Sequence, residues 1–379
     1  MPEIKLVLKK DENAASGRTC CAPAALPAGP WVAGSVNTPC GQAPGISTEL
    51  TRRDRWDNFK CRVSSFRNDY AVPPGLYAVG APDRESEVFV SANYKFSFDT
   101  LRRQLKGLNA WVLVLDTKGI NVWCAAGKGT FGTNELIRRI SSVNLAAVAG
   151  HGKIVLPQLG APGVSAHEVS KATGFRVIYG PVRAKDIPEF IKAGYKATRE
   201  MRTVKFTFWD RLVLSPMEII PAMKKYYPLY ALFALAVFGL QPSGILFRSA
   251  FTGALPFLLL GLASVFSGAF LTPVLLPYVP FRSFAVKGWI MGAAALLFSM
   301  ESSTWFKLVR TNVELLALCL LFFPMASSYI ALQFTGSTTF TGMSGVKKEL
   351  KTAIPIYMAS AVISLLLLAA YKLTEWRLI

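Results

Sequence analysis

The sequence predicts an α/β domain followed by an all-α transmembrane domain of five helices. From Tyr70 to about Gly194, short apolar runs alternate with helical stretches at the spacing of α/β units. From about Pro228 onward the chain changes to long apolar runs with few charges, each close to the roughly 20 residues that a membrane span needs. The chain therefore joins a domain that can fold in water to one that requires a bilayer.

Composition divides the chain into four predicted segments. Residues 1–51 are rich in Ala, Pro and Gly and lack periodicity, which is typical of a mobile tail. Residues 52–205 are predicted to form the α/β domain, which lies in the cytoplasm, and residues 206–227 a linker. Residues 228–379 are the predicted transmembrane domain.

The elements of the α/β domain follow from the length and periodicity of its apolar runs. The predicted strands are Leu76–Val79, Val88–Ala92, Trp111–Leu115, Lys153–Leu156 and Arg176–Tyr179. The predicted helices are Ser97–Gly107, Thr133–Val143, Ser165–Ala172 and Ile187–Ala193. Asp186 with Glu189 has the pattern of a capping box, and Thr133 is expected to cap the helix whose first turn carries Glu135.

Five apolar runs are long enough to be membrane spans. They are Leu229–Phe247, Ala250–Leu271, Phe284–Met300, Val313–Leu332 and Ile354–Tyr371. A charged side chain at the centre of a span costs about 2.5–3.5 kcal/mol, so insertion requires the basic residues to lie at or near span ends. The sequence meets this condition at Arg248, Arg282, Lys287, Lys307 and Arg310.

The basic residues also predict orientation, because loops that stay in the cytoplasm retain lysine and arginine. Lys205, Arg211, Lys224 and Lys225 precede the first span, and Met1–Lys5 lacks the apolar region of a signal peptide. We expect a multi-pass protein of the cytoplasmic membrane, with the N-terminus inside and, after five crossings, the C-terminus outside.

The formal net charge of +19 raises the question of nucleic-acid binding. No recognition fold, zinc finger or aromatic-basic repeat accompanies this charge, so the sequence predicts no nucleic-acid partner. Contact with the lipid bilayer explains much of the charge instead. Basic residues between Arg176 and Lys225 would lie beside anionic headgroups, where each contributes about 1 kcal/mol.

The chemistry of the chain is predicted to centre on Cys124. The run Ala110–Asp116 is typical of a strand buried on both faces, and Asn121 can cap a short helix that Gly127 ends. Cys124 then lies in the first turn, where the positive end of the helix dipole favours a thiolate, with Lys128 one turn further on. A sulfur atom in this position is a metal ligand or a nucleophile.

Three other interpretations of this segment fare less well. Gly127–Gly132 has the G-x-G-x-x-G pattern, but its glycines lie well past the strand and no acidic residue ends a second strand at the expected distance. A phosphate-binding loop requires Ser or Thr after Lys128, where the chain has Gly129. An inert buried cysteine leaves the many glycines around it unexplained.

The segment Asn121–Lys128 resembles the cap helix of the corrinoid-binding domain in HgcA, the family of mercury-methylating corrinoid proteins. The resemblance runs from about Tyr70 to Phe190 and includes Pro74–Tyr77, Ala92–Lys95 and Leu156–Gly163. The large subunit of the corrinoid iron–sulfur protein of acetyl-CoA synthesis is similar over the same domain. The resemblance implies a Rossmann-like corrinoid-binding domain and, as cofactor, cobalamin or a related corrinoid.

The resemblance also implies roles for single residues. Cys124 is expected to be the catalytic residue and the axial ligand of cobalt. The residues expected around one face of the macrocycle are Asn121, Val122, Trp123, Ala125, Ala126, Gly127, Lys128, Gly129 and Thr130. A second set is expected to let the backbone approach the nucleotide tail, namely Gly160, Ala161, Pro162 and Gly163. His151, between two glycines, either approaches the corrinoid or occupies a turn.

The remaining cysteines and histidines limit the kinds of metal site that the chain can form. The six cysteines contain no C-x-x-C pair, so we expect no iron–sulfur cluster and no four-cysteine zinc site. The vicinal Cys20 and Cys21 could capture a thiophilic ion such as Hg(II). Cys319 falls in a span and is expected to serve packing. Of the only two histidines, neither has the D-x-H-x-x-G pattern of cobalt ligation, and His167 is expected on a helix surface.

The function that the resemblance implies is that of a membrane-anchored corrinoid-dependent methyltransferase, which passes a methyl group from cobalt to inorganic Hg(II) and forms methylmercury. A thiolate ligand would favour departure of the methyl group with its bonding electrons, as an electrophilic acceptor requires. The implied partners are a ferredoxin-like iron–sulfur electron donor and a methyltetrahydrofolate-dependent methyl donor system.

Two alternatives stay open at this point. One is a corrinoid methyl carrier of acetyl-CoA, or one-carbon, metabolism, although the barrel and the cluster-binding cysteines of that family are missing. The other is a thiol-based membrane metal transporter or receptor, for which the spans provide no charge pairs and no ordered cysteine pairs.

Overall fold

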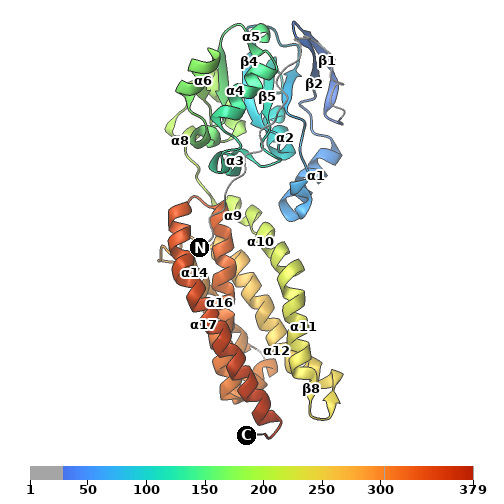
Figure 1. Ribbon diagram of the computed structural model, residues 1–379, viewed down its shortest axis with the longest axis vertical. Coiled ribbons are helices and arrows are strands. Elements are labelled where there is room, and N and C mark those ends of the chain that lie inside the picture. Colours follow the sequence, from blue (N-terminus) through green and yellow to red (C-terminus); the bar gives the residue numbers. More distant parts are fainter. Residues whose placement is uncertain (1–28, 303, 379) are drawn as a thin grey trace, which may run out of the picture. The chain divides into compact units, whose positions relative to one another are not determined.

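The computed structural model describes residues 29–302 and 304–378, which separate into two compact units (Figure 1). The first, here called the sheet domain, extends to Arg55 and resumes from Asn68 to Arg202. The second, here called the bundle, consists of Trp56–Arg67 and the chain from Thr203 onward. Cys20 and Cys21 lie outside the described residues.

The sheet domain is built on a seven-stranded mixed sheet of order β1-β2-β3-β5-β4-β6-β7. Its strands are β1 Val32–Thr38, β2 Gly41–Ile46, β3 Gly75–Val79, β4 Glu87–Ala92, β5 Ala110–Leu115, β6 Lys153–Leu156 and β7 Arg176–Tyr179. The strands β5, β4, β6 and β7 are mutually parallel, whereas β3 is antiparallel to β5 and β1 is antiparallel to β2. The five strands predicted from sequence, the last five of these, are confirmed to within one residue at each end.

The other three parallel strands lie on both sides of β4, with β5 on one side and β6 and β7 on the other. The chain leaves β4 through α2 (Lys95–Gln104) to β5 on one side, and then returns past β4 to β6 and β7. One apolar core, which includes Phe98 of α2 and Phe190 of α7, covers one face of the sheet. A second core, which includes Leu136 of α4 and Val169 of α6, covers the other. The order of the strands therefore reverses between β4 and β6.

Helices α1 to α8 include the predicted helices, close to their expected positions, and also α1, α5 and α8, which were not predicted. They are α1 Arg52–Val63, α2, α3 Val122–Lys128, α4 Thr133–Ser142, α5 Leu145–Val148, α6 Ala166–Thr173, α7 Ile187–Lys192 and α8 Arg199–Arg202, with short 3-10 turns η1 Ser65–Asn68, η2 Gln158–Gly163 and η3 Ala184–Asp186. Two predicted caps are wrong. Gly132 is the N-cap of α4, because the Thr133 hydroxyl accepts a hydrogen bond from Ser165 N instead. Asp186 makes no side-chain cap at α7.

Part of the predicted tail is ordered in the sheet. Residues 32–46 form the antiparallel pair β1 and β2, and β2 continues the sheet beside β3. Ala43 and Ile46 of β2 are buried in the two cores. The run of small residues and Pro44 gave no strand periodicity, and the strands form because the edge of β3 offers backbone partners. The prediction of a mobile tail is therefore wrong for these residues.

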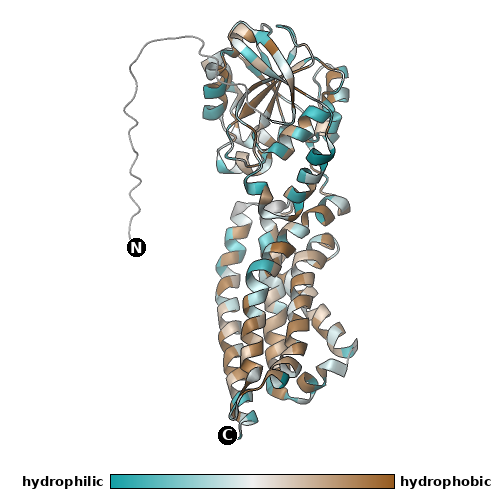
Figure 2. Cartoon of the chain, turned by 90° about the vertical axis from the view of Figure 1, so that its right-hand side faces the viewer, coloured by the Kyte–Doolittle hydropathy of each residue, from teal (hydrophilic) through white to brown (hydrophobic). Residues whose placement is uncertain are grey.

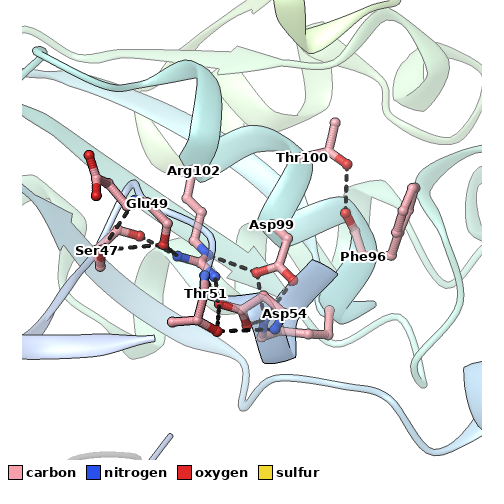
Figure 3. A network of polar contacts seen from close by, with 9 residues as sticks. Ser47, Glu49, Thr51, Asp54, Phe96, Asp99, Thr100 and Arg102 are labelled. Carbon is pink, nitrogen blue, oxygen red and sulfur yellow. Dashed lines mark hydrogen bonds and ion pairs between the residues drawn. The ribbon is translucent and has the colours of Figure 1, made fainter. Parts of the chain in front are cut away.

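A buried cluster of four charges ties α1 to α2 (Figure 3). Lys95 donates to Asp54 Oδ1 at 3.0 Å and to both carboxylate oxygens of Asp99. Arg102 completes the cluster through Asp54 and Asp99, and it also donates to the carbonyl oxygens of Ser47 and Glu49. Each anion thus contacts both cations, which is the arrangement that makes burial of four charges tolerable. The cluster fixes the start of α1 on the sheet domain.

The bundle consists of long helices joined by short turns. Its elements are α9 Phe208–Leu214, α10 Pro216–Pro221, η4 Ala222–Tyr226, α11 Tyr227–Gly239, α12 Phe247–Phe266, η5 Ser267–Leu271, α13 Thr272–Val274, α14 Phe284–Ser302, η6 Thr304–Phe306, α15 Lys307–Thr311, α16 Val313–Gln333, η7 Phe334–Ser337 and α17 Met343–Glu375, with a two-stranded hairpin of β8 Leu240–Gln241 and β9 Gly244–Ile245. Figure 2 shows apolar residues along most of the length of these helices.

Among the described residues, four helices of the bundle are long and apolar enough to cross a membrane. They are Phe247–Val274, Phe284–Glu301, Val313–Gln333 and Ser344–Glu375. The last of them is only 17% buried over its most apolar window, although it is the most hydrophobic. In water this helix would expose a large apolar surface, so we expect its outer side to contact lipid.

A fifth span is not confirmed. The predicted run Leu229–Phe247 begins as α11, but this helix ends at Gly239 and the chain turns into the β8–β9 hairpin. Pro242 and Gly244, whose φ is +118°, lie in that hairpin. Helical residues continue upstream of α11 through η4 and α10, where Lys224 and Lys225 interrupt the apolar run.

The interior of the bundle is closely packed by small residues. A methyl group added at Gly288 would lie 2.5 Å from Ala331 Cβ, and one at Gly292 would lie 2.5 Å from Ser327 Cβ. Ser327 donates to Gly288 O at 2.8 Å and accepts from Ser267 at 2.9 Å. These contacts between α14, α16 and η5 are typical of helix packing in membranes, and they agree with a structural anchor.

Candidate functional site

The predicted site lies at the carboxyl ends of the parallel strands. The helix α3 follows β5, the turn η2 follows β6, and Asn93 directly follows β4. Strand order reverses between β4 and β6, and ligands of doubly wound sheets bind outside such a reversal. The fold therefore brings Asn121–Thr130 and Gly160–Gly163 to the edge of the sheet where a cofactor is expected.

The helix α3 forms because its start is capped as the sequence predicts. The Asn121 side chain accepts from Cys124 N at 2.9 Å, so Cys124 occupies the first turn. The helix ends at Gly129, whose φ of +79° is left-handed, and not at Gly127 as predicted. Gly127 keeps a helical conformation, because the carbonyl of Ala125 accepts from both Thr130 N and Phe131 N beyond the helix end.

Asn93 organises the loop that leads into α3. Its side-chain oxygen accepts from Thr117 N at 3.1 Å, from the Thr117 hydroxyl at 2.8 Å and from Gly119 N at 2.9 Å. The Thr117 hydroxyl in turn reaches Ile120 O at 2.7 Å. The end of β4 thus fixes the loop between β5 and α3. Sequence reasoning noted Asn93 only as part of the resemblance and gave it no role.

Glu135 of α4 fixes the same loop from the other side. Its carboxylate accepts from Asp116 N at 2.9 Å and pairs with Arg138 and Arg139. Burial alone would raise the pKa of Glu135, but hydrogen bonds from the Asp116 amide and from the two arginines outweigh burial and lower this pKa. Glu135 therefore stays ionised at neutral pH and holds the end of β5.

The side chains of α3 divide between the core and the surface. Val122, Ala125 and Ala126 are buried in the core that covers the sheet, so these three side chains pack inside the protein and do not face a ligand. Trp123 is 40% exposed, Cys124 is partly buried, and Lys128 is exposed. Of the predicted contact residues, only those on the outer side of α3 present a side chain to a ligand.

The turn η2 packs directly on α3, and its glycines serve this packing. A methyl group added at Gly163 would lie 2.2 Å from Phe131 O and 3.1 Å from Ala126 Cα. One added at Gly160 would lie 2.4 Å from the ring of Phe131. Both glycines are therefore required by contacts within the chain. Their predicted role toward a nucleotide tail stays a prediction, with Ala161 partly buried and Pro162 exposed between them.

The two histidines lie apart from α3. His151 is in a turn before β6, where Nε2 lies 3.0 Å from Ser86 O and Nδ1 accepts from Lys153 N at 3.0 Å. Both ring nitrogens have backbone partners at the amino ends of the parallel strands. His151 thus occupies a turn at the edge of the sheet opposite to α3. His167 is exposed on α6, as expected.

The other described cysteines do not join Cys124 in a cluster. Cys61 and Cys319 are buried, the latter inside α16 as expected, and Cys40 lies near Asn144 O at 3.9 Å. Within residues 29–302 and 304–378, no three His, Cys, Asp or Glu side chains lie together as a metal site. Of the described cysteines, Cys124 is the one that lies on α3, directly after β5.

Comparison with known proteins identifies relatives of the sheet domain. Residues 64–191 match the family of the CO dehydrogenase/acetyl-CoA synthase delta subunit. Subunit gamma of the acetyl-CoA decarbonylase/synthase complex of Methanopyrus kandleri is 29% identical over 136 residues, which are 35% of this chain and 29% of that subunit. The corrinoid/iron-sulfur protein large subunit of Moorella thermoacetica is 27% identical over 124 residues, which are 32% of this chain and 27% of that subunit.

These matches confirm the predicted similarity to corrinoid proteins. They cover under a third of the length of each relative named, and the family match ends at residue 191, before the four apolar helices. The matched region contains α3 and η2, the two elements that form the candidate site. A particular similarity to HgcA stays a prediction from the residues of α3.

Proposed function

We propose that the chain is a membrane-anchored corrinoid-dependent methyltransferase that methylates inorganic Hg(II). The observation that carries the proposal is the position of Cys124, a partly exposed thiol in the first turn of a capped helix at the strand-order reversal. This helix lies in the region that is similar to a corrinoid protein. Four apolar helices follow it in the same chain.

The donor chemistry of the site fits a corrinoid. A soft thiolate is a suitable donor for cobalt, and Cys124 is the residue that would supply it. When bound, the corrinoid supplies the methyl group and the chemistry of its transfer. Trp123 and Lys128, on the same outer side of α3, would contact the macrocycle.

The protein's own contribution is to hold this sulfur in one place. Asn121 fixes the backbone of Cys124, while Asn93 and Glu135 fix the loop before it. A ligand held by rigid elements loses little entropy on binding, and it keeps its donor atom directed at one position. Cys20 and Cys21, outside the described residues, are proposed to capture Hg(II) before transfer.

A carrier of methyl groups for acetyl-CoA metabolism is the second candidate. The named relatives favour it, because one is a subunit of an acetyl-CoA decarbonylase/synthase complex. We rank it second because the family match ends at residue 191, the matches cover under a third of each relative named, and four apolar helices follow in the described part of this chain. Both candidates need a separate iron–sulfur electron donor and a methyltetrahydrofolate-dependent methyl donor system as partners.

We propose that the sheet domain faces the cytoplasm, where reduced thiols and the methyl donor system are available. The basic residues before the bundle favour this side. Four crossings would return the C-terminus to the cytoplasm, whereas five would place it outside, so the sidedness of the C-terminus tests the number of spans.

One assay separates the two functions. The full-length protein is loaded with methylcobalamin, and it is then supplied either with Hg(II) or with an acetyl-CoA synthase acceptor. We expect methylmercury in the first reaction and no methyl transfer in the second. Transfer to the acceptor without formation of methylmercury would overturn the proposed substrate and support the second candidate.

A further inference from the structure

One face of α1 exposes two neighbouring aromatic rings. Trp56 is 60% exposed and Phe59 is 52% exposed. Their rings are stacked, with centroids 5.5 Å apart and an angle of 23° between the planes. The opposite side of the helix is turned inward, since Asp54 and Cys61 are 2% and 1% exposed. The two rings therefore mark an outer face of α1 that nothing in the described chain covers.

Arginines lie on the same outer face as the rings. Arg52, Arg55 and Arg62 are exposed, and they precede or follow Trp56 and Phe59 at intervals of three and four residues. Residues at these intervals share one side of a helix. This face thus combines flat apolar rings with guanidinium groups and lacks an exposed carboxylate.

A second aromatic pair lies on α9. Phe208 is 44% exposed and Trp209 is 69% exposed, with ring centroids 5.6 Å apart. The helix is fixed to the bundle by Arg211, which is buried and donates to Val274 O at 3.2 Å and to Phe206 O at 2.7 Å. The exposure of these rings is therefore a fixed feature of a braced helix.

Both aromatic pairs belong to the compact unit that contains the candidate spans. The bundle includes Trp56–Arg67 as well as the chain from Thr203 onward. The turn after α1 contacts the bundle, because Arg67 Nη1 lies 3.3 Å from Met217 Sδ of α10. The rings of α1 and Arg62 thus belong to the unit whose helices are suited to a bilayer, and Arg52 and Arg55 precede them on the same helix.

We propose that the outer face of α1, together with Phe208 and Trp209 of α9, binds the headgroup region of a bilayer that contains anionic lipids. Tryptophan is enriched at membrane interfaces because its ring is apolar at one end and a hydrogen-bond donor at the other. Arginine beside it attracts anionic headgroups. The mixture of both on one face suits shallow binding at headgroup level and not immersion in the acyl chains.

This binding would give the sheet domain a second attachment to the membrane, besides the spans. The first turn of α1 is fixed on the sheet domain through Asp54, and the rest of the helix belongs to the bundle. The inference rests on the candidate spans and is independent of which methyl acceptor the protein uses.

Tryptophan quenching in vesicles tests the inference on the full chain. The protein is reconstituted in phosphatidylcholine, with and without phosphatidylglycerol, and lipids brominated near the headgroup end of the acyl chain serve as quenchers. The Trp56 signal is the difference between the wild type and Trp56→Phe. We expect this signal to be quenched by the brominated lipid, and more strongly when phosphatidylglycerol is present.

Matched variants separate binding from misfolding. Replacing Arg52 or Arg55 by Gln should weaken the preference for anionic vesicles about fivefold per residue, whereas Arg103→Gln on α2 should not change it. The Trp209 signal, obtained from Trp209→Phe, should follow that of Trp56, and the signal of buried Trp111 should not. A Trp56 signal that brominated lipid leaves unquenched but acrylamide quenches would overturn the inference, as would protection of Trp56 by an added protein instead of lipid.

Discussion

Among single residues, Asp54 is expected to have a large effect on the stability of the sheet domain. Its carboxylate is buried between Lys95 and Arg102. Burial alone would raise the pKa of Asp54, but hydrogen bonds from Lys95 and Thr51 and the charge of Lys95 outweigh it and lower the pKa to about 2. Because the pKa is lower in the folded state, Asp54 stabilises the domain above its unfolded pKa, and this contribution is lost as the pH falls toward 2.

We therefore expect acid to reduce the free energy of unfolding by about 1–2 kcal/mol through Asp54, between roughly pH 5 and pH 2. Asp54→Asn should cost about 3–5 kcal/mol at neutral pH, because it leaves two buried cations with one anion. Amide hydrogen exchange of β4 and β5 in the full-length protein measures both effects.

Asp57→Asn on the same helix is the matched control. Asp57 pairs with Lys60 at 2.7 Å, and the two side chains are 14% and 35% exposed. An ion pair that water reaches contributes about 0–1 kcal/mol, so this variant should cost less than Asp54→Asn. Equal losses of protection in the two variants would contradict the account of a buried charge cluster.

Among the elements, the contact between η2 and α3 should determine how the candidate site is held. Gly163→Ala would place a methyl group 2.2 Å from Phe131 O, an atom of the backbone that cannot rotate away. We expect η2 to separate from α3, with a loss of about 1–3 kcal/mol typical of overpacking. Faster amide hydrogen exchange in Val122–Lys128 and in Gln158–Gly163 would report this separation.

Gly127→Ala provides the comparison within the same helix. A methyl group at Gly127 meets nothing within 4 Å, and alanine stabilises a helix interior by about 0.5–1 kcal/mol relative to glycine. Exchange in α3 should therefore become slower or stay the same in this variant. If both substitutions speed exchange alike, packing of η2 against the helix does not control the site.

At the scale of the whole molecule, the sequence predicts the parts whose structure depends on local pattern. The predicted strands from Leu76–Val79 to Lys153–Leu156 are largely buried, and short apolar runs mark all five predicted strands, so their positions follow from composition. Asn121 as N-cap of α3 is likewise confirmed, because capping depends on a few neighbouring residues.

Features that depend on distant partners were not predictable in this way. The strands β1 and β2 contain few apolar residues and form against the edge of β3. The cap predicted at Thr133 failed because its side chain bonds outside its own helix, to Ser165 N. Asp186 is the N-cap residue of α7, but its side chain makes no cap hydrogen bond. In the first predicted span, the helix ends and a hairpin follows at Gln241–Gly244. The high hydropathy of the whole run predicted a continuous helix in spite of this turn sequence.

The position of the candidate site could be predicted from one residue and its neighbours. The contacts that hold the site in place could not. Composition and spacing indicated Cys124 and the short helix around it. The roles of Asn93 and Glu135 in holding the loop become apparent only in the sheet, where the ends of β4 and β5 and the start of α4 meet. His151 was separated from the site by the same topology.

The sulfur of Cys124 is proposed as the donor to cobalt, and the visible absorption spectrum of the loaded protein reports on this bond. The full-length protein, its Cys124→Ala variant and a Cys40→Ala control are each loaded with the same corrinoid. We predict that the wild type and the control share one spectrum, distinct from that of the free cofactor, and that Cys124→Ala loses this difference together with methyl transfer. An unchanged spectrum and undiminished turnover in Cys124→Ala would contradict the account.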